Sequence, residues 1–376
     1  MQFAQRHAIE KLQQLLEPLP DVLAFVDELV DRHDSDFGLR ISDCGFKFRR
    51  KRIPSMTDSS RNPQSAIRNR LVECVPNFSE GRKTKTIDRI AGAIESEAGV
   101  VVLNRHIDVD HNRSVITFVG EPRAVANAAV KAVATAKELI DLRTHAGVHP
   151  RIGATDVLPF VPVSGVTMDE CVELAHGVGR RIWNELSIPV YFYERAALRP
   201  DRVRLEHVRG KGFDWLRQEV IKNPDRAPDV GEPELHASAG ATVVGARPFL
   251  IAFNVNLRTN DLSIARTIAQ QVRGRDGGLP FVKALGFELQ SRGVVQVSMN
   301  LVDYEQTGMA RAFAAVQEAA GERQVEVLSA EIVGLIPRAA LDRGAAYFPY
   351  LENFRETLVI ETLLEQIAER RMPSKP

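Results

Sequence analysis

Apolar and polar residues between positions 71 and 193 follow two different periods. Short β-branched runs predict strands, whereas apolar residues three and four positions apart predict helices. In chain order these segments predict the pattern βαββαβ, followed by one more helix and one more strand. The expected elements are strand Leu71–Val75, helix Ile87–Ile94, strands Val100–Leu103 and Ser114–Val119, helix Glu121–Ile140, strand Val157–Val163, helix Met168–Glu185 and strand Pro189–Tyr193.

The second half of the chain repeats this order. Two βαββαβ units predict an α/β (α+β) protein built from two ferredoxin-like subdomains. A ligand groove is expected between the subdomains, because binding sites form preferentially at such interfaces. The expected elements are strand Phe249–Asn256, helix Ser263–Arg273, a hairpin of Ala284–Leu289 and Val294–Leu301 with its turn at Ser291–Gly293, helix Thr307–Ala320 and strand Val325–Val333.

The first 69 residues have a different character. Apolar residues recur at helical spacing only over residues 22–30. Residues 40–70 hold nine basic and two acidic residues, a net charge of +7, together with Ser, Pro and Asn. We therefore expect an N-terminal extension over 1–69, a helix plus a basic linker, that is either disordered or lies upstream of a true start at Met56. The expected subdomains are 70–247 and 248–366, followed by a tail at 367–376.

Composition and charge narrow the class of protein. Of the 376 residues, 44% are hydrophobic and 26% charged, and 49 basic side chains balance 49 acidic ones. This balance excludes a generally basic nucleic-acid coat protein, so no nucleic-acid partner is expected. No uncharged apolar run reaches the roughly 18 residues that span a membrane, so no membrane partner is expected. Three scattered cysteines, Cys44, Cys74 and Cys171, favour a reducing, cytoplasmic compartment over a disulfide framework.

The densest polar cluster is Thr144–Arg151, with the sequence THAGVHPR, followed by Asp156. His145 and His149 stand four residues apart, a spacing that serves zinc sites when both lie on a helix. Here a glycine and a proline interrupt such a helix, and the Glu of the H-E-x-x-H motif is missing, so no metal is expected. A loop that carries His, Arg and Asp between a helix and a strand favours a catalytic loop. A purely structural histidine loop remains the alternative.

Two further segments are rich in polar residues. Asp108–Arg113, at the start of a predicted strand, either binds a cation or orients a base, or forms a polar hairpin turn. Gly231–Gly240 is a long irregular stretch that the pattern places at the junction of the two repeats, and such loops commonly bind ligands. The basic run Lys47–Arg52 is interpreted as a solvated linker rather than a phosphate site. Neither a P-loop nor a G-x-G-x-x-G motif occurs, which argues against a nucleotide cofactor.

Several motifs together, in collinear order, resemble those of one family. The segment from Leu71 to Arg82, LVECVPNFSEGR, resembles the opening of the glutamate formimidoyltransferases. The resemblance covers about residues 70–360, and the agreement of many motifs is far more specific than any one of them. The other motifs are Asn112-Arg113, TFVG at 117–120, HPRIGA at 149–154, MDECV at 168–172, Pro228-Asp229, GAR at 245–247, AFNVNL at 252–257, VQVSMN at 295–300 and LENF at 351–354.

The resemblance implies a reaction and a set of site residues. The reaction moves a formimidoyl group between 5-formimidoyltetrahydrofolate and L-glutamate in histidine degradation, with tetrahydrofolate as co-substrate and no metal. The resemblance further implies a folate groove between two α/β subdomains and a homodimer. The family's catalytic histidine falls on His149. The carboxylates of both substrates suit arginine, and Arg113, Arg151 and Arg247 are the candidates. The family's folate-binding loop falls on Gly231, Glu232, Pro233, Glu234, Leu235, His236, Ala237, Ser238, Ala239 and Gly240.

Some residues favour one branch of the family. Glu234, His236 and the run 108–113 resemble bacterial monofunctional members, and the chain ends at Pro376 without the length expected for a cyclodeaminase domain. Val148 stands where the family usually has Glu or Gln, so one polar neighbour of the site is missing. Two alternatives therefore stay open. The scaffold could move a formyl group from 5-formyltetrahydrofolate to glutamate, or bind folate with little catalysis.

Overall fold

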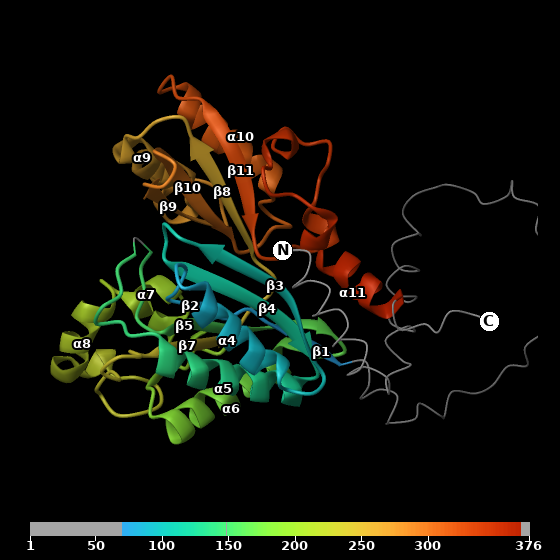
Figure 1. Cartoon of the computed structure of the whole chain (residues 1–376). Coiled ribbons are helices and arrows are strands. Elements are labelled where there is room, and N and C mark those ends of the chain that lie inside the picture. The colour runs from blue at the N-terminus through green and yellow to red at the C-terminus, as the bar shows by residue number, and fades with distance from the viewer. Residues whose placement is uncertain (1–69, 148, 370–376) are drawn as a thin grey trace, which may run out of the picture. The chain divides into compact units, whose positions relative to one another are not determined.

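The computed structural model describes residues 70–147 and 149–369 of the chain (Figure 1). Residues Leu71–Leu363 form one compact unit, and every contact discussed below lies within it. The helix and linker expected over 1–69, and most of the tail expected at 367–376, lie outside the described residues. Among the helices that the structure describes, none is long and apolar enough to cross a membrane.

The first subdomain is a seven-stranded sheet over residues 71–246. Its strands run in the order β3, β4, β1 with β2, β5, β7 and β6, and β1 and β2 are successive segments of one line between β4 and β5. β5, β7 and β6 are parallel to one another, and the other pairings are antiparallel. The strands are β1 Leu71–Cys74, β2 Asn77–Phe78, β3 Val100–Asp108, β4 Arg113–Gly120, β5 Thr155–Ser164, β6 Val190–Glu194 and β7 Thr242–Ala246.

Three long helices cover one face of this sheet: α4 Thr84–Glu95, α5 Pro122–Leu139 and α6 Met168–Leu186 (Figure 1). Each helix buries one apolar stripe against the strands, as its spacing predicts. α5 starts at a proline, which suits the first turn because that position donates no helical hydrogen bond. α6 starts with a capping box, in which Thr167 and Glu170 satisfy each other's backbone N–H groups. The subdomain also contains α7 Leu205–Arg209 and α8 Phe213–Lys222.

The second subdomain is a four-stranded antiparallel sheet in the order β11, β8, β10, β9. This is the order of a ferredoxin-like unit, and β5, β1, β4 and β3 of the first sheet follow it too, so the two predicted βαββαβ units are confirmed. The helices α9 and α10 pack on one face of this sheet. The elements are β8 Ile251–Leu257, α9 Leu262–Val272, β9 Val282–Leu289, β10 Val294–Leu301, α10 Met309–Gly321, β11 Val327–Val333 and α11 Ile360–Glu369.

Each sheet has a second face that carries no helix. In the first sheet that face carries Glu73, Thr117 and Arg113, since these residues alternate with the apolar residues that face the helices. In the second sheet it carries a polar cluster on β8, β10 and β11, whose members are Asn254, Asn256, Gln296, Ser329 and Glu331. Most of these side chains are buried although they are polar, so their partners decide what each face can do.

Some elements differ from those expected. β3 extends to Asp108, five residues beyond the predicted end, because its polar half is only partly buried and a bulge interrupts the alternation after Val102. β7 was not expected, since TVVGA is short and contains a glycine. α7, α8 and α11 were not expected either. Gly231–Gly240 lies between the two βαββαβ units in the chain, as expected, but it is followed by β7, which adds a strand to the first sheet.

Candidate active site

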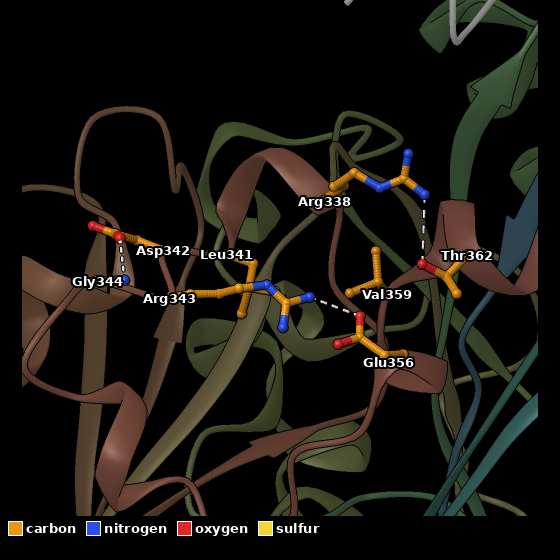
Figure 2. A pocket seen from close by; sticks show the side chains of 8 residues that line it. All are labelled: Arg338, Leu341, Asp342, Arg343, Gly344, Glu356, Val359 and Thr362. Atoms are coloured by element: carbon orange, nitrogen blue, oxygen red, sulfur yellow. Dashed lines mark hydrogen bonds and ion pairs between the residues drawn. The ribbon is translucent and has the colours of Figure 1, made fainter.

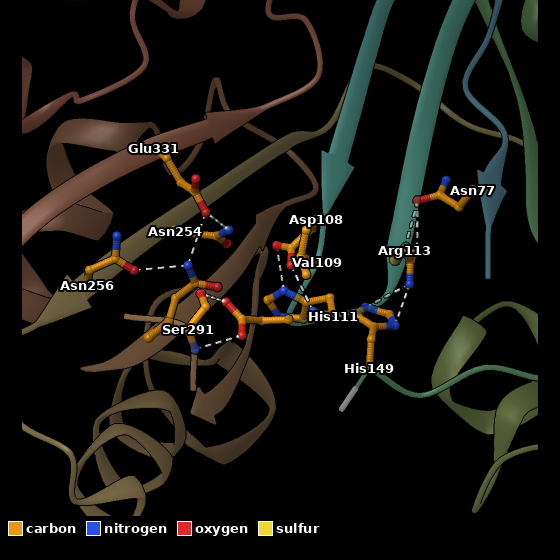
Figure 3. Close-up of polar contacts among 12 residues, drawn as sticks. Asn77, Asp108, Val109, His111, Arg113, His149, Asn254, Asn256, Ser291 and Glu331 are labelled. Atoms are coloured by element: carbon orange, nitrogen blue, oxygen red, sulfur yellow. Dashed lines mark hydrogen bonds and ion pairs between the residues drawn. The ribbon is translucent and has the colours of Figure 1, made fainter. Parts of the chain in front are cut away.

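His149 lies on the loop that joins α5 to β5, and its ring is held by two neighbours. The Nδ1 atom lies 2.8 Å from the carbonyl oxygen of Pro150, and the Nε2 atom lies 2.8 Å from Nη1 of Arg113 (Figure 3). Nη1 of Arg113 contacts Nδ1 as well as Nε2. A guanidinium can only donate, so the ring nitrogen that accepts from it holds a lone pair. These partners assign a neutral imidazole to His149. The ring keeps partial exposure to solvent.

Arg113, the first residue of β4, is fixed from the side opposite His149. Its Nη2 and Nε atoms donate to Oδ1 of Asn77 on β2 at 2.6 and 3.2 Å (Figure 3). Burial, followed by the charge of Arg209, lowers the pKa of Arg113 to about 10, which leaves it protonated at neutral pH. The structure therefore brings two of the expected site residues, His149 and Arg113, into direct contact.

A buried carboxylate stands beside this pair. Asp156 on β5 accepts from the backbone N–H of Ile152 at 2.8 Å and from Nη2 of Arg209 at 2.5 Å, and it lies 3.8 Å from Nη1 of Arg113. Arg209 ends α7, a five-residue helix, and carries no motif that sequence reasoning could use. Only the tertiary structure brings it to the loop of His149.

These charges act on the protonation of His149. Burial comes first, and the positive charges of Arg113 and Arg209 and the neighbouring His111 add to it, so the pKa of His149 lies well below its ordinary value. His149 is therefore neutral at physiological pH in the free protein. A neutral imidazole with a lone pair on one ring nitrogen is the form that can accept a proton.

A turn and an aromatic ring complete the surroundings of His149. His111, in the turn between β3 and β4, places its Nδ1 atom 2.6 Å from Oδ2 of Asp108, and its ring centroid lies 6.0 Å from that of His149. Phe287 on β9 lies across both histidines, with ring centroids at 4.8 Å from His111 and 5.9 Å from His149. Residues 109–112 form a turn between β3 and β4, and an aspartate–histidine pair, Asp108 and His111, lies at this turn next to the site.

The other expected arginines lie differently. Arg151 donates from Nη2 to the carbonyl oxygen of His145 at 2.6 Å, so it braces the histidine loop. Arg247 follows β7 and donates to the carbonyl oxygen of Pro248 at 3.0 Å, and its charge acts on buried Glu73. Neither has a described contact with His149. His145 itself lies 3.0 Å from the carbonyl oxygen of Asn112 through Nε2. Val148 lies outside the described residues.

The loop 231–240 packs against the histidine loop through backbone hydrogen bonds. Leu142 N–H donates to Ser238 O at 2.8 Å, Ala154 N–H to Ala239 O at 2.8 Å, and Ala241 N–H to Ile152 O at 2.9 Å. These bonds pin both ends of the segment that carries His149. Two bonds to this loop and one to the residue that follows it therefore set the position of the segment that carries His149.

The polar cluster of the second sheet is internally hydrogen-bonded. Glu331 Oε1 accepts from Asn254 at 2.8 Å and from Gln296 at 3.0 Å, and Gln296 also donates to Asn256 Oδ1 at 2.9 Å (Figure 3). The charge of Glu331 also acts on His106 of β3. The helix-free face of the second sheet, which carries both Glu331 and Phe287, therefore meets the first subdomain near the site.

A separate pocket of about 480 Å³ lies on the second subdomain (Figure 2). Arg343 on its wall pairs with Glu356 at 2.7 Å, and Arg338 reaches the hydroxyl of Thr362 at 3.5 Å. None of its lining residues is a site residue named above, so we do not assign the reaction to it. Within 70–147 and 149–369, no group of three or more His, Cys, Asp or Glu residues is arranged to hold a metal ion.

The fold and site together define a class: a two-subdomain α/β protein that carries a histidine–arginine–aspartate cluster on its first ferredoxin-like unit. Comparison with known proteins is more specific. The formiminotransferase domain, N-terminal subdomain, matches residues 71–247, and the formiminotransferase domain matches residues 252–371. The chain belongs to the formiminotransferase family.

Similar proteins carry consistent names. The chain is 46% identical to the glutamate formimidoyltransferase of Thermoplasma acidophilum over 79% of this chain and 98% of that one. It is 43% identical to the glutamate formimidoyltransferase of Streptococcus pyogenes serotype M1 over 76% and 95%. The formimidoyltransferase-cyclodeaminase of Rattus norvegicus is 43% identical over 78% of this chain but 56% of its own length.

Proposed function

We propose that this chain transfers the formimidoyl group between 5-formimidoyltetrahydrofolate and L-glutamate, as in histidine degradation. The names of the two full-length relatives support the reaction. The observation in the site that carries the proposal is the neutral His149, whose ring contacts the Arg113 guanidinium. A base, His149, and a cation, Arg113, therefore lie side by side. This suits glutamate, whose amine must lose a proton and whose carboxylates need a positive partner.

His149 is proposed as the general acid and base. As the glutamate nitrogen forms its bond to the formimidoyl carbon, the unprotonated ring nitrogen of His149 accepts the proton that the glutamate nitrogen loses. When the bond between that carbon and folate N5 breaks, the same proton passes to N5. One histidine therefore acts as the base when the amine adds and as the acid when N5 leaves. Such proton transfer contributes about 10²- to 10⁴-fold in rate. The remainder comes from holding two substrates in line.

The substrate-binding roles are proposed from the same arrangement. Gly231–Gly240 is proposed to bind folate, and its backbone bonds to the loop of His149 support this. Arg113 is proposed to bind a substrate carboxylate, since it touches His149. Arg151 and Arg247 remain proposed carboxylate ligands, in a supporting position. The folate groove is proposed to lie where Phe287 of the second sheet meets the histidines of the first subdomain.

Two histidine variants test the catalytic proposal. His149→Ala should lower turnover at least about 100-fold while folate still binds, because it removes the base and leaves the loop. His145→Ala is the matched control on the same loop and should be much milder, since the described contact of its ring is to a backbone carbonyl. Near-wild-type turnover of His149→Ala would refute the assignment, and equal losses would point to a paired-histidine site.

Donor choice separates the remaining alternatives. A turnover assay with 5-formimidoyl- and 5-formyltetrahydrofolate distinguishes formimidoyl transfer, formyl transfer and binding without catalysis. We expect turnover with the formimidoyl donor.

The assembly and location are also proposals. The family resemblance supports a homodimer, which sedimentation would test. It also supports a cytoplasmic location, together with the free, buried thiol of Cys74.

A further inference from the structure

Two guanidiniums beside His149 share a single carboxylate. Asp156 Oδ2 lies 2.5 Å from Nη2 of Arg209 and 3.8 Å from Nη1 of Arg113. The three side chains come from β5, α7 and β4, so the arrangement is a product of the fold. All are largely removed from water, with side-chain exposures of 3% for Asp156, 11% for Arg209 and 18% for Arg113.

The positive charge at this point is not balanced. Within the described residues, Asp156 is the carboxylate with which Arg113 and Arg209 form ion pairs. Arg247, the next arginine along this face, acts on Glu73 and Tyr193 instead. The Nε atom of Arg209 is buried and has no hydrogen-bond partner among the described residues. Asp108 also acts on Arg113 but forms no ion pair with it, so two guanidiniums pair with one carboxylate and one donor stays unused.

Burying two like charges on one counter-ion is unfavourable unless a further anion arrives. Arginine suits a carboxylate in particular, because its planar fork offers parallel N–H donors. An anionic group held at this position would be next to the Nε2 atom of His149, since Arg113 contacts both Asp156 and that nitrogen.

We propose that Arg209, together with Arg113, forms a carboxylate-binding site of the substrate beside His149. The proposal rests on the proposed function in one respect, because the carboxylate is taken to belong to a substrate of that reaction. Arg209 is then a binding residue that neither the motifs nor the family comparison singled out. Asp156 is its positioning residue, and holds the guanidinium toward the histidine loop.

Filling this site would also change His149. The groups that face its ring are Arg113 from β4, Arg209 from α7 and His111 from the turn between β3 and β4. Both arginines disfavour the imidazolium, and a bound carboxylate offsets them. The pKa of His149 should therefore rise when the anion binds, which strengthens the base only when a substrate is present.

Two sources offer the required carboxylate. One is the amino-acid substrate, and the other is the glutamate tail of folate. Glutarate has the carboxylates of the amino-acid substrate but lacks its reactive amine. The compound p-aminobenzoylglutamate has the glutamate tail of folate but lacks the pterin. Neither probe can therefore take part in the transfer reaction. Calorimetric binding of each probe to the full chain therefore tests the site independently of turnover.

The decisive variant is Arg209→Gln, with Arg204→Gln as the matched control. Arg204 precedes the same helix and is exposed. Loss of a charged hydrogen bond at Arg209 should weaken binding of one probe about 10- to 100-fold. Arg204→Gln should leave it unchanged. Weakening of glutarate assigns the site to the amino acid, and weakening of p-aminobenzoylglutamate assigns it to the folate tail. Arg209→Lys keeps the charge without the fork and should fall in between.

A measurement on the unaltered chain guards against a variant that fails to fold. The pKa of His149, followed by NMR of its ring, should rise on addition of the probe that binds. The proposal is overturned if neither probe raises that pKa, or if Arg209→Gln and Arg204→Gln bind both probes as the wild type does. Failure of the proposed function would look different: the probes would bind through Arg209, yet neither folate donor would be turned over.

Discussion

The neutral state of His149 is a property of its neighbours rather than of its residue type. An ordinary histidine titrates near neutrality, but here burial and two arginines disfavour the imidazolium. The contacts agree with this, because Arg113 can only donate and lies against both nitrogens of the ring, one of which must hold a lone pair. A lowered pKa makes His149 a weaker base. A substrate carboxylate bound to the two arginines would partly raise that pKa again.

This predicts a specific pH profile. The acid limb of kcat/KM, which reports the free enzyme, should lie below pH 6.5, because His149 stays neutral until the pH falls below its lowered pKa. The acid limb of kcat, which reports the bound complex, should lie at higher pH than that of kcat/KM. Steady-state rates from pH 4.5 to 9 measure both. An acid limb of kcat/KM above pH 6.5 would contradict the lowered pKa.

A second residue-scale prediction concerns Glu73 in the first sheet. Burial, partly offset by Arg247, raises its pKa from 4.5 to about 7. The folded state therefore holds a proton between these pH values that the unfolded chain has lost. Its stabilising contribution is complete below pH 4.5 and is lost as the pH rises through about 7.

Urea unfolding at several pH values tests this for Glu73→Gln. The free energy of unfolding of the wild type, relative to this variant, should fall by roughly 3 kcal/mol between pH 4.5 and 8. Glu138→Gln, at an exposed helical position, is the control and should show no such slope. A pH-independent difference between wild type and Glu73→Gln would show that the carboxyl titrates normally.

At the scale of elements, the site depends on how two loops dock. The segment that carries His149 has no regular structure, and it is held by backbone bonds to the loop 231–240. Gly240 makes this docking possible. Its φ is +69°, and a Cβ atom there would lie 2.0 Å from the carbonyl oxygen of Ile152. No other residue type combines that backbone conformation with so close an approach.

Gly240→Ala should therefore destabilise the fold by at least about 2 kcal/mol and lower turnover, because it separates the two loops. Gly177→Ala in α6 is the matched control, since a Cβ there meets no atom within 4 Å. That change should be neutral or stabilising by up to about 1 kcal/mol. Urea unfolding of both variants checks this, and equal stabilities would mean that the docking does not require Gly240.

At the scale of the whole unit, polar contacts connect the two subdomains. Lys283 on β9 reaches Glu206 on α7 at 3.2 Å and Glu194 on β6 at 3.5 Å. Ser291 in the β9–β10 turn donates its N–H to Asp110 at 3.0 Å. Meanwhile each subdomain has its own apolar core, and among the described residues these cores span 72–246 and 251–358. Side chains of turns and element ends therefore connect the subdomains through polar contacts, beside the aromatic contact of Phe287 with the histidines.

The last prediction concerns the segment before this unit. The two cores and the site described above lie between residues 71 and 363. A chain that starts at Met56 should therefore keep the melting temperature and turnover of the full chain within experimental error. Calorimetry and the transferase assay compare the two proteins. Loss of stability or activity in the shorter chain would mean that residues 1–55 contribute contacts that the rest of the chain needs.

Much of the architecture was determined by the sequence. The two βαββαβ units followed from local periodicity, because a helix or strand that buries one face must repeat its apolar residues at 3.6 or 2 positions. His149 and Arg113 were singled out because they stand in motifs that resemble those of the family, and the structure places their side chains in contact. The sequence did not predict short elements such as β7 and α7, because a pattern over five residues cannot distinguish a strand or helix from a loop.

Only the tertiary structure decided the chemistry around His149. Arg209 stands 60 positions further along the chain and Phe287 further still, and no local pattern connects either to the histidine. Their effect depends on distance and burial, since a charge acts strongly on an imidazole only when it is close and shielded from water. The sequence by itself therefore determined the elements and the residue types of the site. The neutral histidine, the shared carboxylate and the unbalanced arginine pair exist only once the chain has folded.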